Sequence, residues 1–282
     1  MRNKILRNGV GMPEIGFGTF MMRGAQLEES VRCAISCGYR LIDTAASYRN
    51  ESEIGRAVRD SGIPREELFL TTKLWVQDAG YEQALRAFET SCKALDMDYI
   101  DLYLIHQPFG DYYGAWRAME KLYQEGRIRA IGVSNFAPDR LVDLCLNTEI
   151  PPMVNQIERH PFYQQNDALH EMEKYGVIPQ AWGPLCEAQC DIFHHPVLER
   201  IAQAHECSAA QIILKWNLQS GVAVIPRSAQ KTHRIENISL DNIILTDEEL
   251  AQIADLDRGH SEIIDHRCAH TARQIINMKI HA

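Results

Sequence analysis

Four polar residues end or directly follow apolar, strand-like stretches in the first half of the sequence. Asp43 closes one such run, Lys73 ends the stretch "FLTTK", and His106 follows "LYLI". Tyr48 comes shortly after Asp43. A capping carboxylate, a solvated lysine and a buried histidine each have ordinary structural explanations, but their shared position at strand ends suggests a common chemical task.

These residue types suit proton transfer to a carbonyl oxygen. A free tyrosine has a pKa near 10 and is a weak acid at neutral pH. An ammonium group within about 4–6 Å lowers such a pKa, so we expect Lys73 to lower the pKa of Tyr48 and Asp43 to keep Lys73 charged. His106 can donate a hydrogen bond to the substrate oxygen. A second hypothesis makes Lys73 the Schiff-base nucleophile of an aldolase-type barrel, although a neighbouring carboxylate favours its protonated form.

Eight strand-like runs alternate with helical patterns along the chain. They cover residues 14–20, 39–45, 68–74, 99–106, 129–135, 153–159, 177–182 and 222–228. Regular alternation of this kind predicts an α/β fold with a parallel sheet, and eight strands are the number that closes a (β/α)8 TIM barrel. The carboxyl ends of barrel strands face a common mouth, where the four polar residues would meet.

The segments outside the eight repeats are short. Before the first strand, Asn8-Gly9 lies between short apolar pieces and predicts a β-hairpin, which we expect to plug the barrel floor. After residue 257 the sequence has one further helical stretch, residues 269–278. Because no linker-like segment interrupts the pattern, we expect residues 1–282 to form a single domain.

The charge balance narrows the possible partners. The 282 residues include 29 basic and 38 acidic side chains, for a net charge of −9, which disfavours nucleic acid and anionic membranes as partners. No apolar run approaches the roughly 18 residues of a membrane span. The first residues lack the apolar core of a secretion signal. We therefore expect a cytoplasmic protein, and a monomer, since no apolar surface stripe stands out.

A cluster of cysteines and histidines occurs in "CEAQCDIFHHP", with Cys186, Cys190, His194 and His195. The spacing can be drawn as a zinc site. Closed zinc sites, however, usually have tighter Cys-x2-Cys pairs. We expect a polar loop with two buried thiols and no metal.

A redox reaction would need a cofactor, because none of these side chains carries electrons. The glycine pairs of the N-terminal region lack the third glycine of G-x-G-x-x-G and the strand–helix context of a Rossmann domain. Barrels instead bind phosphate at the loops after strands seven and eight, here residues 182–185 and 225–237. The second loop carries hydroxyl and basic side chains at the start of a predicted helix, namely Arg227, Ser228, Lys231, His233 and Arg234. They suit a phosphate clamp, although a solvated helix start has the same composition.

Taken together, the motifs resemble those of the aldo-keto reductases, and most closely the bacterial members related to 2,5-diketo-D-gluconate reductase. The matching segments, in order, are "GFGTF", "LIDTAASYRNE", "TKLW", "LYLIH", "GRIRAIGVSNF", "NQIERHP" and "VIPRS". The resemblance runs from residue 4 to about residue 257. It implies a (β/α)8 barrel that binds NADP(H) in an extended pose and reduces small-molecule aldehydes or ketones to alcohols.

The resemblance also assigns roles to individual residues. The implied catalytic tetrad is Asp43, Tyr48, Lys73 and His106, with Tyr48 as the general acid. The implied cofactor-binding residues are Gly18, Thr19, Asp43, Ser134, Asn135, Gln156, Trp182, Gly183, Leu185, Arg227, Ser228, His233, Glu236 and Asn237. The implied substrate-binding residues are Phe20, Tyr48, Trp75, His106 and Gln107. An alternative is a nucleotide-binding regulatory barrel with little catalysis.

Several positions depart from the family pattern. Arg227 stands where lysine is common and His233 where arginine is usual, while the adjacent Arg234 is turned by about 100° on a helix. These two positions therefore bear on the strength of the preference for NADP(H), but not on its direction. Phe20 and Gln107 replace tryptophans that often line the pocket, which favours small, hydroxylated or dicarbonyl substrates.

Overall fold

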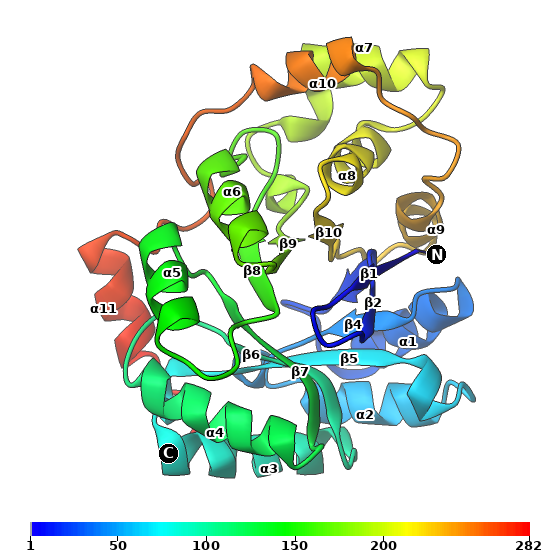
Figure 1. Cartoon of the computed structure of the whole chain (residues 1–282). Coiled ribbons are helices and arrows are strands. Elements are labelled where there is room, and N and C mark those ends of the chain that lie inside the picture. The colour runs from blue at the N-terminus through cyan, green and yellow to red at the C-terminus, as the bar shows by residue number, and fades with distance from the viewer. Residues whose placement is uncertain (1) are drawn as a thin grey trace.

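The computed structural model describes residues 2–282 and contains a barrel of eight parallel strands (Figure 1). The barrel strands are β3 (Gly16–Gly18), β4 (Leu41–Asp43), β5 (Phe69–Leu74), β6 (Ile100–Ile105), β7 (Ile128–Ser134), β8 (Val154–Glu158), β9 (Ile178–Trp182) and β10 (Ala223–Val224). Each strand pairs in parallel with its sequence neighbour. All eight predicted strands are confirmed, although most are shorter than their apolar runs.

Backbone contacts between the first and last strands close the barrel. Ile15 and Val224 form a parallel bridge, and the Gly18 amide donates to the Pro226 carbonyl at 3.1 Å. A methyl group at Gly18 would lie 2.7 Å from the Ile225 carbonyl oxygen. The close approach therefore requires glycine at position 18.

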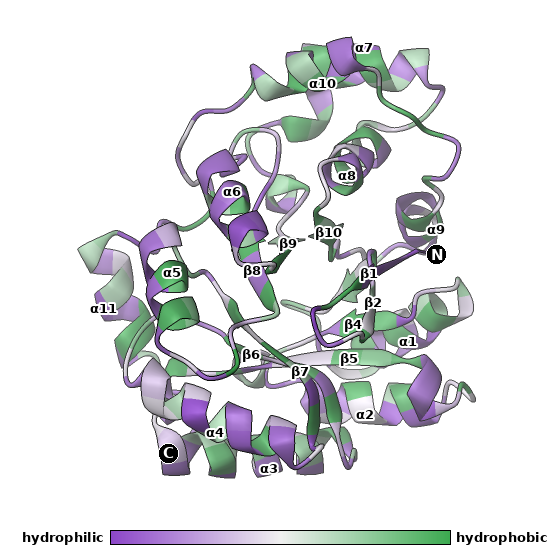
Figure 2. Ribbon diagram, viewed as in Figure 1, coloured by the Kyte–Doolittle hydropathy of each residue, from purple (hydrophilic) through white to green (hydrophobic). Residues whose placement is uncertain are grey.

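Helices surround the barrel strands, as the alternating pattern predicts (Figure 1). They are α1 (Gly24–Ser36), α2 (Glu51–Arg59), α3 (Tyr81–Leu95), α4 (Tyr112–Gln124), α5 (Pro138–Leu146), α6 (Asn166–Lys174), α7 (Pro196–Ala204), α8 (Ala209–Gln219), α9 (Lys231–Ile238), α10 (Asp247–Ala254) and α11 (Ala269–Asn277). Figure 2 shows hydrophobic and hydrophilic residues alternating along α3 and α4. Such helices bury one face against the sheet and expose the other.

Strands β5 and β6 are buried along their whole length. Parallel strands covered by helices on one side and a filled barrel interior on the other have no solvent-facing side. This explains why their sequences, "FLTTKL" and "IDLYLI", do not alternate between apolar and polar residues. Polar residues in these strands therefore need partners inside the protein.

The predicted N-terminal hairpin is also present. Strands β1 (Asn3–Ile5) and β2 (Gly11–Pro13) pair in antiparallel fashion. The side-chain amide of Asn8 donates to the carbonyl of Arg129, the second residue of β7, at 2.8 Å, and Met12 is fully buried. The hairpin therefore covers the amino-terminal end of the barrel, opposite the mouth.

The C-terminal segment passes over the carboxyl ends of the strands. Its helix α11 coincides with the predicted helical stretch 269–278 almost residue for residue. The indole nitrogen of Trp75 donates to the Met278 carbonyl at 2.9 Å, and Gln77 donates to the His281 carbonyl at 3.0 Å. Among the helices of residues 2–282, none is long and apolar enough to cross a bilayer.

Candidate active site

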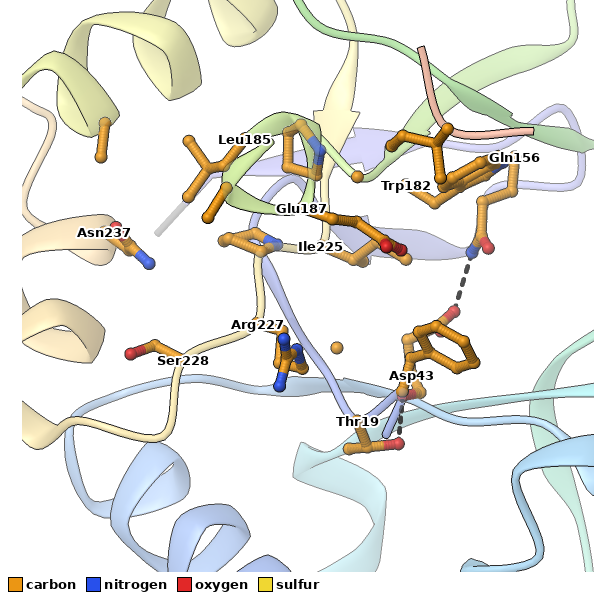
Figure 3. Close-up of a pocket in the computed structure, with 18 of the residues that line it drawn as sticks. Thr19, Asp43, Gln156, Trp182, Leu185, Glu187, Ile225, Arg227, Ser228 and Asn237 are labelled. Carbon is orange, nitrogen blue, oxygen red and sulfur yellow. Dashed lines mark hydrogen bonds between the residues drawn. The ribbon is translucent and has the colours of Figure 1, made fainter. Parts of the chain in front are cut away.

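A cavity of about 1060 Å³ opens at the carboxyl ends of the barrel strands (Figure 3). Every residue that the family resemblance assigned to cofactor or substrate binding lines this cavity. Of the four proposed catalytic residues, Asp43, Tyr48 and His106 line it, whereas Lys73 lies behind them. The segments that form the cavity come from all parts of the chain, which the barrel brings to one end.

The four proposed catalytic residues form one connected group. Lys73 is fully buried in β5, and its Nζ donates to Asp43 Oδ1 at 2.5 Å and to the Thr44 carbonyl at 2.8 Å. The same nitrogen lies 5.2 Å from the ring centre of Tyr48. The rings of Tyr48 and His106 are 5.7 Å apart. The expected ion pair between Asp43 and Lys73 is therefore present beneath the tyrosine.

The direction of the Tyr48 pKa differs from the expectation. Burial and the carboxylates of Asp43 and Glu187 raise the pKa of Tyr48 well above its usual value, whereas we expected Lys73 to lower it. The main physical reason is burial of the phenol; in addition, Lys73 already shares its charge with Asp43 at 2.5 Å, so little of it acts on the phenol. The phenol consequently keeps its proton at neutral pH and can act as an acid.

His106 is held in its neutral form. Burial, together with the charges of Lys73 and His266, lowers the pKa of His106 well below its usual value. Ser47 Oγ lies 3.3 Å from Nδ1 of His106. A hydroxyl that donates to Nδ1 leaves the ring hydrogen on Nε2, from which a neutral imidazole can donate to a ligand oxygen.

A network of amides joins the ends of the next three strands. Gln156 Nε2 donates to Asp43 Oδ2 and to Gln180 Oε1, both at 2.8 Å, and Trp182 Nε1 donates to Asn135 Oδ1 at 2.8 Å. Asn135 Nδ2 in turn donates to Ser134 Oγ at 3.1 Å. The network fixes the Trp182 ring and the amide groups at the cavity wall, as binding of a planar amide-bearing ring requires.

The opposite end of the cavity carries the predicted phosphate residues. Arg227, Ser228 and His233 line it, but Lys231 and Arg234 do not. Arg234 is buried and donates to the Ser228 carbonyl at 3.0 Å, so it shapes the loop. Two of the five residues proposed for the clamp thus face away from it, because consecutive helical residues point in different directions.

Several lining residues were not expected from the sequence. The C-terminal segment contributes Ile263, Ile264, His266, Ile275 and Met278, and the loop after β9 contributes Glu187. Figure 3 shows the Glu187 side chain extending across the cavity. The sequence has no motif at these positions, and only the tertiary fold brings them to the mouth.

The loop that carries Glu187 has an unusual backbone. Five of its non-glycine residues adopt positive φ angles, namely Cys186 (51°), Glu187 (49°), Ala188 (61°), Cys190 (57°) and Asp191 (52°). Left-handed backbone costs about 1–2 kcal/mol for each residue other than glycine. The loop is therefore a strained part of the cavity wall.

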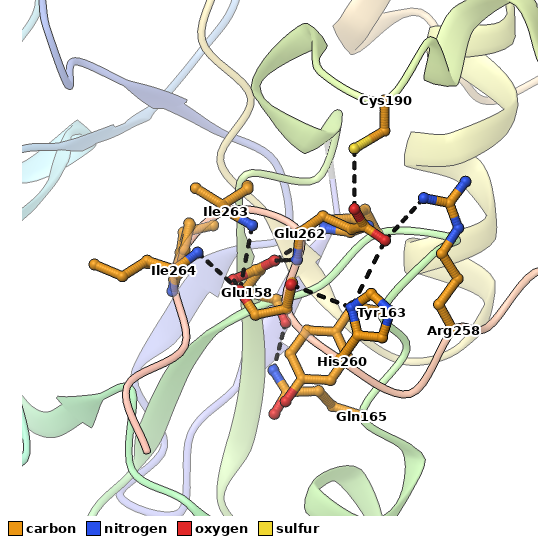
Figure 4. A network of polar contacts seen from close by, with 12 residues as sticks. Glu158, Tyr163, Gln165, Cys190, Arg258, His260, Glu262, Ile263 and Ile264 are labelled. Carbon is orange, nitrogen blue, oxygen red and sulfur yellow. Dashed lines mark hydrogen bonds and ion pairs between the residues drawn. The ribbon is translucent and has the colours of Figure 1, made fainter. Parts of the chain in front are cut away.

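Glu158, at the end of β8, anchors the C-terminal segment (Figure 4). Its buried carboxylate accepts hydrogen bonds from Ser261 Oγ at 2.7 Å and the Glu262 amide at 3.1 Å, and lies 3.1 Å from His160 Nε2. The anchored segment places Ile263 against Gly183, where an added methyl group would lie 3.0 Å from its Cδ1 atom. The contacts hold the segment over the cavity.

The cysteine–histidine cluster does not converge. Cys186 is buried, but Cys190 is exposed and donates to Glu262 Oε2 at 3.1 Å. His194 Nδ1 lies 3.1 Å from Glu199 Oε1. The expectation of two buried thiols is wrong for Cys190, because its side chain points to the C-terminal segment. Over residues 2–282, no three His, Cys, Asp or Glu side chains are placed to hold a metal ion.

This combination of barrel, plug and strand-end residues agrees with a comparison of the chain with known protein families. Residues 14–191 match the model of the aldo/keto reductase family. The chain belongs to the aldo/keto reductase family.

Three known proteins illustrate the similarity. The chain is 49% identical to an uncharacterised oxidoreductase of Bacillus subtilis (strain 168), over 88% of this chain and 90% of the relative. It is 47% identical to glyoxal reductase of the same organism, over 90% of this chain and 92% of the relative. The crystal structure of a Bombyx mori aldo-keto reductase in complex with NADP superposes with a TM-score of 0.88 at 32% identity, covering 94% of this chain and 96% of that chain.

Proposed function

We propose that this protein is an NADP(H)-dependent carbonyl reductase in which Tyr48 is the general acid. The observation that carries the proposal is the approach of a protonated phenol and a neutral imidazole, with ring centres 5.7 Å apart, at the wall of one large cavity. The relatives add support, since they include a glyoxal reductase and a structure in complex with NADP. The expected organisation as a single domain is consistent with the one cluster of buried hydrophobic residues among residues 2–282.

The cavity walls fit the proposed cofactor at both ends. At one end, Arg227 and Ser228 offer a guanidinium and a hydroxyl, which suit a phosphate. At the other, Trp182 offers an aromatic face and Gln156 an amide oxygen that accepts no hydrogen bond from the described part of the chain. When bound, NADPH supplies the hydride that no side chain of this protein can supply.

The protein's own side chains would then bind and protonate the carbonyl oxygen of the substrate. Tyr48 donates its phenolic proton to the oxygen as negative charge develops, and His106 orients the oxygen by donating from Nε2. The buried ion pair of Asp43 and Lys73 sets the position of the phenol from below. A Schiff base at Lys73 is disfavoured, because its Nζ is buried, engaged by two acceptors and outside the cavity lining.

The test is NADPH consumption with glyoxal, methylglyoxal and a panel of small aldehydes and keto-sugars, measured beside NADH. We expect clear turnover with NADPH and slower turnover with NADH. Tight NADPH binding without turnover on any carbonyl would instead support a regulatory nucleotide-binding barrel. The cytoplasmic location, the monomeric state and the closer likeness to 2,5-diketo-D-gluconate reductase stay predictions.

The preference for NADPH is expected to depend on Arg227. Replacing Arg227 with alanine removes the charge-assisted contact to the 2′-phosphate and should raise the KM for NADPH about tenfold or more, with little effect on NADH. The change His233→Arg should lower the KM for NADPH several-fold, because it adds a permanent cation. Steady-state kinetics with both cofactors measures the two effects.

Lys231 provides the matched control. It lies on the same helix as His233, is exposed and does not line the cavity. The variant Lys231→Ala should leave the ratio of the two KM values unchanged. An equal effect of Lys231→Ala and Arg227→Ala would refute a specific clamp and point to a general charge effect.

A further inference from the structure

A short strap of four residues, 278–281, crosses the loop that follows β5. The Met278 carbonyl accepts a hydrogen bond from the indole nitrogen of Trp75 at 2.9 Å. The next carbonyl, that of Lys279, accepts a hydrogen bond from Arg49 Nη2 at 3.1 Å. Exposed chain segments are usually poorly ordered unless specific contacts hold them. The strap is therefore tied to the barrel at its first two residues.

The next two residues of the strap bind the short 3-10 helix Val76–Asp78. Gln77 Oε1 accepts a hydrogen bond from the Ile280 amide at 2.8 Å, and Gln77 Nε2 donates to the His281 carbonyl at 3.0 Å. The imidazole of His281 places Nε2 at 2.9 and 3.0 Å from the two carboxylate oxygens of Asp78. All four residues of the strap are thus held, and His281 adds an ion pair to the hydrogen bonds.

The strap supports one wall of the cavity. Trp75 and Met278 both line the cavity, and Trp75 is 4% exposed. The Trp75 ring meets the His106 ring edge to face, with ring centres 5.3 Å apart. Release of the strap would remove both the acceptor of the indole nitrogen and the cover at this side of the mouth. The position of Trp75 therefore depends on contacts that lie outside the cavity lining.

The charge of His281 depends on its partners. Hydrogen bonds to Asp78 and to the Ala282 oxygen raise the pKa of His281 above its usual value, whereas partial burial and the charge of Lys279 act in the opposite direction. Because the pKa is raised in the folded protein, the charged pair contributes fully below the ordinary histidine pKa of about 6.5. Its contribution is lost as the pH rises through the raised pKa. Neutral His281 keeps a hydrogen atom on Nε2, so the pair weakens without breaking.

Two further titratable side chains near the pair leave this direction unchanged. Arg49, which binds the Lys279 carbonyl, stays charged at any pH at which the protein is folded. Tyr103 of β6 interacts with Asp78, but burial is the main cause that raises its pKa well above the usual value, so the phenol stays neutral. The titration of His281 is therefore the event that changes the charge of the strap near neutral pH.

We propose that His281 is a positioning residue for the Trp75 wall, and that its charged pair with Asp78 holds the strap over bound substrate most tightly at acidic to neutral pH. This role rests on the proposed reductase function of the cavity. His281 acts through the strap and Trp75, without touching the substrate. Exposed ion pairs contribute little and the His281 side chain is half exposed, so we expect its charge to change substrate affinity about two- to fivefold.

The first test compares the KM for methylglyoxal, with NADPH as cofactor, between about pH 6 and about pH 9 in three proteins. His281→Lys keeps a cation over this range, since the lysine pKa is about 10.4, and His281→Gln keeps a hydrogen-bond donor without a charge. The wild-type KM should match that of His281→Lys at the acidic end and rise about two- to fivefold, to that of His281→Gln, at the alkaline end. The kcat should change less, because the strap holds substrate and transition state alike.

His205→Gln is the matched control. His205 also pairs with a carboxylate, that of Glu249 at 2.9 Å, but it lies outside the cavity lining. Its KM profile should therefore follow that of the wild-type protein. A constant ratio between the KM values of the wild-type protein and His281→Gln across the pH range would overturn the proposal, as would a pH effect confined to kcat.

Hydrogen exchange of the Trp75 indole separates this inference from the reductase function. The NMR signal is identified by its absence in Trp75→Phe, and the protein is measured without cofactor or substrate. At a given pH the chemical exchange rate is the same in each variant, so differences report opening of the strap. Wild-type exchange that equals that of His281→Lys at about pH 6, and is about two- to fivefold faster at about pH 9, supports the role of His281 even if no carbonyl is turned over. Equal rates in the two proteins at both pH values would overturn it even if turnover is fast.

Discussion

The variant Tyr48→Phe is expected to lose about 10²–10⁴-fold in kcat, the usual contribution of a general acid. The change removes only the phenolic oxygen, so the ring contacts with Phe20 and His106 remain. Burial and nearby carboxylates raise the pKa of Tyr48, so the wild-type phenol holds its proton at neutral pH and releases it only as negative charge develops on the substrate oxygen. Single-turnover kinetics with NADPH and a reactive aldehyde measures the loss at the chemical step.

Cofactor affinity distinguishes a chemical role from a structural one. NADPH should bind Tyr48→Phe with nearly the wild-type Kd, as followed by quenching of tryptophan fluorescence. Tyr99→Phe is a suitable control, since Tyr99 lies just before β6, at the opposite end of the barrel, and its side chain packs on Arg65. Turnover in Tyr48→Phe equal to that of the control would remove Tyr48 from the mechanism.

The second large effect is expected at the buried ion pair. The variant Lys73→Met leaves the Asp43 carboxylate buried without its cation and should lower the free energy of unfolding by about 3–5 kcal/mol. Burial already raises the pKa of Asp43 and lowers the pKa of Lys73, and each charge offsets part of the cost of burying the other. Urea unfolding followed by circular dichroism measures the change.

A double variant separates stability from function at this pair. Asp43→Leu combined with Lys73→Met replaces both charges by apolar groups, and it should recover most of the lost stability without recovering turnover. Lys174→Met serves as the control, because Lys174 belongs to an exposed ion pair with Glu171, and such pairs contribute little. A single variant Lys73→Met as stable as this control would show that the pair is not a coupled unit.

The sequence was sufficient to predict the barrel because its signals are local. Each strand is a short apolar run next to a helical pattern, and Asn8-Gly9 marks the hairpin. The strand-end positions of Asp43, Lys73 and His106 then followed from the barrel geometry, since parallel strands bring their carboxyl ends together. Strand ends were less predictable, because apolar residues continue into buried loops beyond the last ladder hydrogen bond.

Other features of the site depend on distant contacts that no local pattern contains. The pKa of Tyr48 is raised partly by Glu187, which lies far along the chain. His266 affects the pKa of His106 from the C-terminal segment, for which the sequence predicts only one further helical stretch. Cys190 is exposed because Glu262 provides its partner. These outcomes follow from how the loop after β9 and the C-terminal segment meet at the mouth of the barrel, and only tertiary structure determines that.

Because Glu158 anchors the C-terminal segment, this segment and the barrel must change together when the protein diverges or is redesigned. The hydrogen bonds from Ser261 Oγ and the Glu262 amide cross from residue 158 of the barrel to a segment about a hundred residues later. A C-terminal segment transplanted from a relative would bring new side chains to the cavity. It would keep its position over the cavity only if it also brought a donor for the Glu158 carboxylate. Chimeras designed to exchange substrate specificity must therefore take the residue at position 158 and the C-terminal segment from the same parent protein.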